Sequence, residues 1–172
     1  MIVKLFDIAN GVVIPTEHCY TLVSLKNIMD EYPDDYLKIY QYLFYMTCPN
    51  PDINPFFNTS EIDKEEIILN EIQAEFSTED PPIQVALEFC ARMYETPTFR
   101  AYKGIKQMLD KLATYMETTT ITHGRDGNIN SLVAAAAKFQ QIRDSYKGAY
   151  KDLQEEQKSQ VRGGAGLAYD QT

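Results

Sequence analysis

The longest apolar periodicity in the chain lies between Asn128 and Lys158, and it limits the folds that the sequence can adopt. Apolar residues recur there every three or four positions, close to a heptad pattern with one slip, as on one face of an α-helix. The stripe consists of Ile129, Leu132, Ala136, Phe139, Ile142, Tyr146, Ala149 and Leu153. A helix over this range would be about 45 Å long. That exceeds what a bundle of 172 residues needs, so we expect the helix to form a spine or to project at one end.

Shorter helical patterns precede this run, from about residue 21 onward. We expect helices at 22–31, 34–47, 60–76, 81–95 and 97–118. The range 34–47 is so rich in aromatic residues that it should lie centrally, covered on more than one side. Asp80-Pro81 and Thr96-Pro97 each place a capping side chain before a proline at the first helical position. Ser60 to Asp63 resembles a capping box that would open the helix at 60–76.

Two loops and one glycine complete the expected helical region. Three prolines between Cys48 and Asn58 forbid regular helix and predict a rigid loop. Thr118 to Gly127 should be a polar loop, after which Asp126 or Asn128 would cap the long helix. Gly104 weakens its helix by about 1 kcal/mol relative to alanine, which suggests that a neighbour approaches closely there.

The strand signals are confined to the first sixteen residues. The β-branched and aromatic segments 2–8 and 12–14 flank Asn10-Gly11, a typical two-residue turn of a β-hairpin. A lone hairpin is marginally stable in water, so it should pack on the helices or pair with another chain. The candidate turn and edge residues for such pairing are Val3, Leu5, Asn10, Gly11 and Val13.

The last residues differ from the helices before them. Three of the eight glycines fall between residues 161 and 172, so we expect no helix there. Apolar side chains in this segment would be wasted in solvent, which favours an arm that docks on a partner; a frayed terminus is the alternative. The candidate docking residues are Arg162, Gly163, Gly164, Leu167, Tyr169 and Asp170.

The expected fold is therefore mainly α. It comprises a β-hairpin arm at 1–20, a helical bundle at 21–158 with one long C-terminal helix, and an extended Gly-rich arm at 159–172. With 44% hydrophobic and 24% charged residues, the composition is that of an ordinary globular protein. No apolar run is long enough to span a membrane, and charge interrupts the N-terminal segment too early for a signal peptide.

The net charge of −9 is unevenly distributed. Residues 1–86 hold 15 acidic and 4 basic side chains, whereas residues 87–172 hold 10 acidic and 12 basic ones. The first half would repel a phosphate backbone, and the second is too balanced for a strong basic footprint. Binding of the isolated chain to duplex DNA is therefore not expected, although an acidic surface can line a conduit through which DNA passes.

We predict no catalytic residue, metal site or cofactor. Cys19, Cys48 and Cys90 are widely spaced and form no CxxC pair, so buried free thiols are expected. His18-Cys19 would be a nucleophile and base only if sequence neighbours also faced each other, which is the weaker interpretation. The acids at the start of the helix near residue 61 are explained by capping and solubility.

Four segments of the sequence, here called the four sequence phrases, carry a resemblance to a known family. They are Phe44 to Pro55, Tyr94 to Tyr102, Gly124 to Asn128, and Arg162 to Gln171. In these phrases the chain resembles small virion structural proteins of crAss-like tailed bacteriophages. Among the parts of such virions, the architecture is most similar to a head–tail connector protein: a small helical bundle, one long helix and a terminal arm.

The resemblance implies a place, partners and a role. Such proteins are made in the host cytoplasm and form homo-oligomeric rings, twelve-fold by analogy, in the neck of the virion between portal and tail. They contact the portal and neighbouring ring or tail proteins, and DNA passes through without sequence-specific contact. By this analogy, 159–172 would dock on the next layer and the hairpin would add strands to a neighbouring subunit.

Other functions remain open from the residues. One is a packaging or regulatory DNA-binding protein similar to a small terminase subunit, and another is a capsid accessory protein. DNA binding would need a basic patch on the helices of the second half. Its members would be Arg100, Lys103, Lys106, Lys111, Arg143, Lys147 and Lys151. Acids alternate with these cations along the helices, which favours a solvated face.

Overall fold

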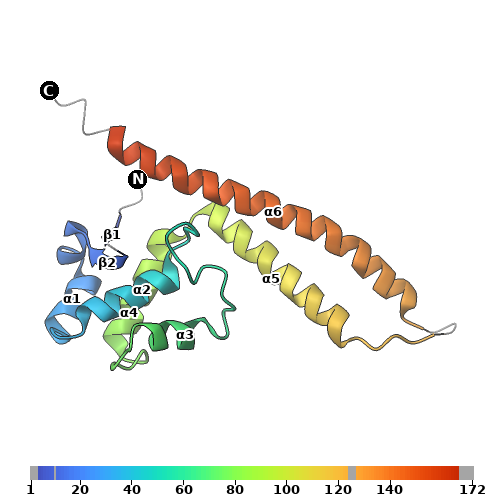
Figure 1. Ribbon diagram of the computed structural model, residues 1–172, viewed down its shortest axis with the longest axis horizontal. Coiled ribbons are helices and arrows are strands. Elements are labelled where there is room, and N and C mark those ends of the chain that lie inside the picture. Colours follow the sequence, from blue (N-terminus) through green and yellow to red (C-terminus); the bar gives the residue numbers. More distant parts are fainter. Residues whose placement is uncertain (1–3, 10, 124–126, 167–172) are drawn as a thin grey trace. The chain divides into compact units, whose positions relative to one another are not determined.

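The computed structural model describes residues 4–9, 11–123 and 127–166, with only the backbone described for 159–166. It is mainly helical with a small N-terminal hairpin, as predicted (Figure 1). The elements are β1 (Phe6–Ala9), β2 (Val12–Pro15), a 3₁₀ helix (Glu17–Tyr20), α1 (Val23–Glu31), α2 (Tyr36–Thr47), α3 (Lys64–Glu71), α4 (Pro81–Tyr94), α5 (Pro97–Thr118) and α6 (Ile129–Gly166). The chain divides into two compact units, which we call unit 1 (Met1–Glu95) and unit 2 (Thr96–Thr172). The boundary between the two units, after Glu95, lies inside the range 21–158 that was predicted to form a helical bundle.

Helix α2 is the centre of unit 1. Its buried side chains point in several directions and belong to one core with residues of α1, α3, α4 and the hairpin. They are Ile39, Tyr40, Tyr42, Leu43 and Phe44. The hydroxyl of Tyr40 donates to the carbonyl oxygen of Leu25 in α1 at 2.8 Å, which satisfies a polar group inside the core. The prediction of a central helix covered on more than one side is confirmed.

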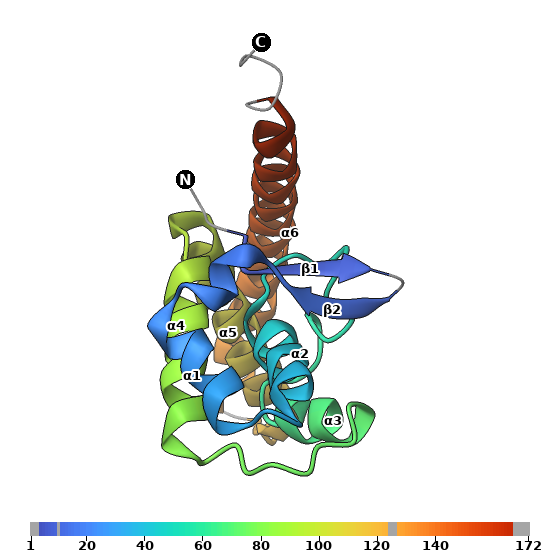
Figure 2. The same ribbon diagram turned by 90° about the vertical axis from the view of Figure 1, so that its left-hand side faces the viewer.

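The β-hairpin packs on the helices of its own unit. β1 and β2 pair antiparallel, with Ile8 opposite Val13 and Gly11 at a φ of 78°, as a two-residue turn with left-handed backbone requires. The ring of Phe6 lies 5.7 Å from that of Tyr40 and 6.1 Å from that of Phe44, measured between centroids. Figure 2 shows the two strands beside α2. Burial of its inner face against α2 thus stabilises a hairpin that would be marginal alone.

The proline-rich segment after α2 is an ordered loop, held by a buried amide. Asn54 donates from Nδ2 to the carbonyl oxygens of Tyr45 at 2.9 Å and Cys48 at 2.8 Å, and its Oδ1 accepts from the N–H of Phe56 at 3.1 Å. Buried backbone carbonyls without partners are costly, so this one side chain replaces the hydrogen bonds that the prolines prevent.

Helix α3 is shorter than the predicted range 60–76. Residues 60–63 form a turn, and Asp63 precedes the helix without a side-chain capping bond, so the expected capping box is wrong. At the other end, Gln73 has a φ of 50°, in the left-handed region, which stops the helix after one C-cap residue. Phe76 then packs at 6.1 Å against the ring of Tyr42 instead of continuing the helix.

Unit 2 is a pair of antiparallel helices, α5 and α6, that pack along one seam (Figure 1). The seam residues are at least partly buried and follow a strict three–four spacing. In α5 they are Tyr102, Ile105, Leu109 and Leu112; in α6 they are Leu132, Ala135, Phe139, Ile142, Tyr146, Ala149 and Leu153. The predicted stripe placed Ala136 in the seam, but Ala136 is exposed and Ala135 takes its place, which removes the slip. The seam is that of a two-stranded coiled coil.

Three predictions about unit 2 are corrected. α6 continues to Gly166, so the helix does not end at Lys158, and 159–166 is not an extended arm. Nucleation is the unfavourable step of helix formation, and about thirty helical residues precede this point. Extending the helix through Gly163 and Gly164 therefore requires only propagation, which adds one hydrogen bond per residue. Residues 167–172 lie outside the described residues. At Gly104, no atom of the described chain beyond the adjacent residues and the local helix backbone lies within 4 Å of where a Cβ would be, so the expected close neighbour is not there.

The start of α6 is fixed by its loop. The side chain of Asn128 accepts from the N–H of Thr122 at 2.9 Å and donates to the carbonyl oxygen of Thr120 at 2.9 Å. Asn128 therefore bonds back to the loop, and its Oδ1 does not act as the predicted helix cap; Asp126, the alternative cap, lies outside the described residues. A Cβ at Gly127 would collide with the carbonyl oxygen of Thr122, which explains the glycine.

The two helices that begin with proline, α4 and α5, generate a stability prediction for Thr96. Its Oγ1 accepts from the N–H of Phe99 at 3.1 Å and donates to Oε2 of Glu156 at 3.1 Å, whereas Asp80 makes no side-chain capping bond to α4. We expect Thr96→Val to lower the free energy of unfolding of unit 2 by about 1–2 kcal/mol, because both bonds are lost at similar volume. Thr96→Ser keeps the hydroxyl, so it should lower the free energy of unfolding by less than half as much as Thr96→Val. Urea unfolding measures both decreases. Equal losses for both variants would contradict the capping role.

Candidate interaction surfaces

The predicted hairpin edge residues lie mostly inside unit 1. The side chains of Leu5 and Val13 are buried in the unit's own core, and Gly11 is exposed at the turn. Val3 and Asn10 lie outside the described residues. The strand edges are partly blocked, because Pro15 in β2 has no N–H and the carboxylate of Asp7 accepts from the N–H of Ile8 at 2.8 Å. The hairpin therefore offers a partner little beyond its outer side chains.

The predicted C-terminal docking residues are only partly described. Arg162, Gly163 and Gly164 belong to the last turns of α6, where the structure describes the backbone alone. Leu167, Tyr169 and Asp170 lie outside the described residues.

A tyrosine cluster joins α5 to α6 at the end of the pair that includes Pro97. The rings of Tyr102 and Tyr146 lie 5.3 Å apart and those of Tyr102 and Tyr150 6.0 Å apart, and the first two hydroxyls are 3.0 Å from each other. Burial raises the pKa of Tyr102 well above its usual value, so the hydroxyl stays protonated. The cluster and the buried Leu153 make this end of the seam a closed, packed contact.

The other end of the pair leaves large apolar side chains exposed. The exposed fraction is 54% for Met108 and 64% for Val133. Tyr115, Met116, Ile121 and Ile129 are also exposed. Two helices bury only the stripe that they share, so side chains beside the seam stay in water unless a further layer covers them. Large apolar side chains left in water at one end of a helix pair mark a candidate interaction site.

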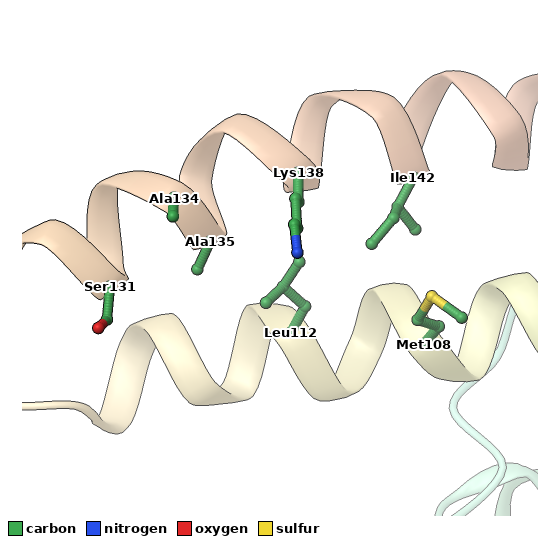
Figure 3. A pocket seen from close by; sticks show the side chains of 7 residues that line it. All are labelled: Met108, Leu112, Ser131, Ala134, Ala135, Lys138 and Ile142. Atoms are coloured by element: carbon green, nitrogen blue, oxygen red, sulfur yellow. The ribbon is translucent and has the colours of Figure 1, made fainter.

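A groove of about 420 Å³ lies on one side of this exposed end, between α5 and α6 (Figure 3). We call it the α5–α6 groove; its lining is Met108, Leu112, Ser131, Ala134, Ala135, Lys138 and Ile142. Met108 and Leu112 point from α5 toward α6, and Lys138 and Ile142 point back toward α5. Three of the five side chains that α6 contributes to the lining, those of Ser131, Ala134 and Ala135, are small, which leaves room beside the larger side chains of α5.

An exposed apolar residue also stands out in unit 1. Ile62 has 90% of its side chain exposed in the turn before α3, and Ile67 within the helix is 43% exposed. Exposed carboxylates of Glu61, Asp63 and Glu66 surround them in the sequence. We call residues 61–67 the acid-rich segment. Sequence reasoning assigned its acids to capping and gave Ile62 no role; its position among acids, outside any apolar stripe, was the signal available.

The predicted buried thiols are confirmed for all three cysteines. Burial raises the pKa of Cys19 and of Cys48 to about 11, and it raises the pKa of Cys90 further. Cys19 donates from Sγ to the carbonyl oxygen of Leu5 at 2.9 Å, which is a structural contact. These groups are protonated and enclosed at neutral pH, the opposite of a reactive thiolate.

Within 4–9, 11–123 and 127–166, no group of three or more His, Cys, Asp or Glu side chains is placed to hold a metal ion. Among the helices of the same residues, none combines the length and hydropathy that crossing a membrane requires.

No protein-family model matches the chain, and neither a curated protein nor a solved structure matches it. The family resemblance of the four sequence phrases therefore stays a prediction.

The buried thiols generate a pH prediction for unit 1. Above about pH 9 the unfolded chain loses thiol protons that the folded chain keeps to about pH 11, so the unfolded state gains stability. The free energy of unfolding should therefore be constant up to about pH 9 and fall as the pH rises toward 11. Urea unfolding at several pH values measures this, and Cys90→Ala should flatten the fall. Rapid reaction of the native thiols with a thiol reagent at pH 8 would contradict their burial.

Proposed function

We propose that the chain is a structural subunit of the head–tail connector of a tailed bacteriophage. Copies of the chain would form a closed ring between portal and tail, in the neck of the virion, with DNA passing through the ring. The resemblance of the four sequence phrases supports the phage setting, and the mainly helical architecture with one long helix suits a connector subunit. The contacts with portal and tail proteins and the twelve-fold symmetry belong to the same proposal.

The single observation that carries the assembly role is the incomplete packing of unit 2. Its two helices leave Met108, Tyr115, Ile129 and Val133 exposed along one end of the pair. Such side chains contribute stability only when another surface removes them from water, at about 25 cal/mol per Å² of apolar area. Unit 1 differs, because its helices and hairpin enclose a common core. The exposed end of unit 2 is thus the surface that an assembly would complete.

The distribution of charge supports contacts between unlike surfaces of neighbouring copies. Residues 1–95 carry 17 acidic and 5 basic side chains, a net charge of −12, whereas residues 96–172 carry 8 acidic and 11 basic ones, a net charge of +3. Unit 1 of one copy therefore attracts unit 2 of another, while two copies of unit 1 repel each other. Contacts between two different surfaces generate rings when the rotation closes.

The same charges suit a conduit for DNA better than a DNA-binding protein. A strongly acidic unit does not hold a phosphate backbone, so DNA would pass without sequence-specific contact. The cations of unit 2 lie among acids, as in the pair between Lys151 and Glu155 at 3.8 Å. The alternative role similar to a small terminase subunit predicts a salt-dependent shift of duplex DNA by the purified chain.

Native mass spectrometry of the purified chain, together with imaging of particles labelled on the chain, tests the proposal. We expect a closed homo-oligomer and label at the neck of the virion. A chain that is monomeric at all concentrations and absent from particles would refute the connector role. Label on the capsid surface would instead favour a capsid accessory protein.

The C-terminal segment gives a prediction about incorporation. Deleting 161–172 removes the last turn and a half of α6 together with the proposed docking residues, but none of the seam up to Leu153. We expect circular dichroism to show the helical fold almost unchanged, and we expect purified particles to lack the truncated chain. Deleting only 167–172 separates the terminal residues from the end of the helix. Normal incorporation of the longer deletion would defeat the docking role of the segment.

A further inference from the structure

We infer that the α5–α6 groove of one copy receives the acid-rich segment of a second copy of the chain. The inference rests on the proposed homo-oligomeric assembly and names the two surfaces that would meet in it. One surface belongs to unit 2 and the other to unit 1, so each copy offers both halves of the contact.

The groove favours an apolar and acidic occupant. Its floor is formed by Met108, Leu112, Ala134, Ala135 and Ile142, and its volume of about 420 Å³ falls within the usual range of small apolar binding sites. Met108 is 54% exposed, so water covers an apolar side chain that an occupant would bury.

One lysine lines the groove, and a second precedes a lining residue in the sequence. Lys138 lines the groove and extends from α6 toward α5 in Figure 3, and Lys111 is exposed next to the lining residue Leu112. Neither lysine has an acidic residue three or four positions away on its own helix, and neither forms an ion pair within the described residues. The groove is therefore apolar with a cationic border, and it would attract an apolar group flanked by carboxylates.

The acid-rich segment has the complementary chemistry. Ile62 and Ile67 are exposed and provide apolar anchors, while Glu61, Asp63 and Glu66 provide exposed carboxylates. The one cation of the segment lies below the surface. Lys64 is buried, and its Nζ donates inward to the carbonyl oxygen of Met46 at 3.1 Å.

A second groove is a poorer occupant than the acid-rich segment. Two grooves facing each other would bring Lys111 and Lys138 of one copy toward the same lysines of the other, and like charges at an interface oppose association. The contact between groove and segment joins opposite charges instead. Because it joins different surfaces, it leaves a free groove at one end of a pair of copies and a free segment at the other, as a ring requires.

Charge reversal on each surface tests the inference in the full-length chain. The groove variant carries Lys111→Glu and Lys138→Glu, and the segment variant carries Glu61→Lys and Glu66→Lys. We expect each alone to weaken association about tenfold or more in sedimentation velocity, since two attractions become repulsions. An equimolar mixture should associate again with the two variants alternating, because the wild-type groove meets the wild-type segment and the reversed groove meets the reversed segment. Combining all four substitutions in one chain should restore the wild-type oligomer.

Matched controls separate the contact from general effects of charge and folding. Lys147→Glu and Lys151→Glu together change the charge of unit 2 by the same amount, at positions of α6 outside the groove lining, and they should leave the oligomer unchanged. Ile62→Ser should weaken association, whereas Val23→Ser, at a residue of unit 1 that is 73% exposed, should not. Circular dichroism of every variant should match that of the wild type.

The outcomes distinguish this contact from the assembly role itself. A wild-type oligomer that both variants still form would overturn the contact and leave the proposed function standing. A mixture of groove variant and wild type that associates more tightly than wild type would show a groove facing a groove. A wild-type chain that stays monomeric, with the segment cross-linked to the groove of its own copy, would overturn the contact and the assembly together.

Discussion

A pair of helices can share only one stripe of side chains, and this limit governs unit 2. The strict three–four spacing from Leu132 to Leu153 gives α6 one apolar seam, and the apolar stripe of α5 packs against this seam. The tyrosines around Tyr102 close one end of the pair, but the small residues of α6 near Ala134 leave the other end thin and partly apolar at its surface. Unit 1 is not restricted to one shared stripe, because side chains of α1, α3, α4 and the hairpin cover α2 on several sides. The contrast between a finished and an unfinished unit is what points toward assembly.

Much of the fold could be predicted, because prolines and apolar stripes mark helices locally. The starts at Pro81 and Pro97 and the central position of α2 follow from such signals. The end of α3 does not, because Gln73 adopts a left-handed backbone that glycine or asparagine usually marks. The exchange of Ala136 for Ala135 has a similar cause: four successive alanines offer no difference in side chain from which to read the facing position.

The candidate surfaces were harder to predict than the helices, because they depend on which residues meet across elements. The alternation in β1 and β2 shows that Phe6, Ile8 and Val13 share a face, but it does not show whether that face meets α2 or another chain. Lys64 reads as a surface charge until its contact with the carbonyl of Met46, eighteen residues earlier, is known. The α5–α6 groove depends on the register between the two helices, which places Lys138 opposite Leu112 and Ile142 opposite Met108.

The two-residue junction between α4 and α5 and the separate cores of the two units have a thermodynamic consequence. Anything that binds only the folded form of a unit raises its melting temperature by mass action, in proportion to the logarithm of the free concentration of the binding partner. A unit that contacts no other copy melts at a temperature independent of dilution. A unit that neighbouring copies complete melts later in concentrated solution than in dilute solution, so the interval between the two melting transitions of one polypeptide would change with dilution wherever the two units depend on their neighbours to different degrees.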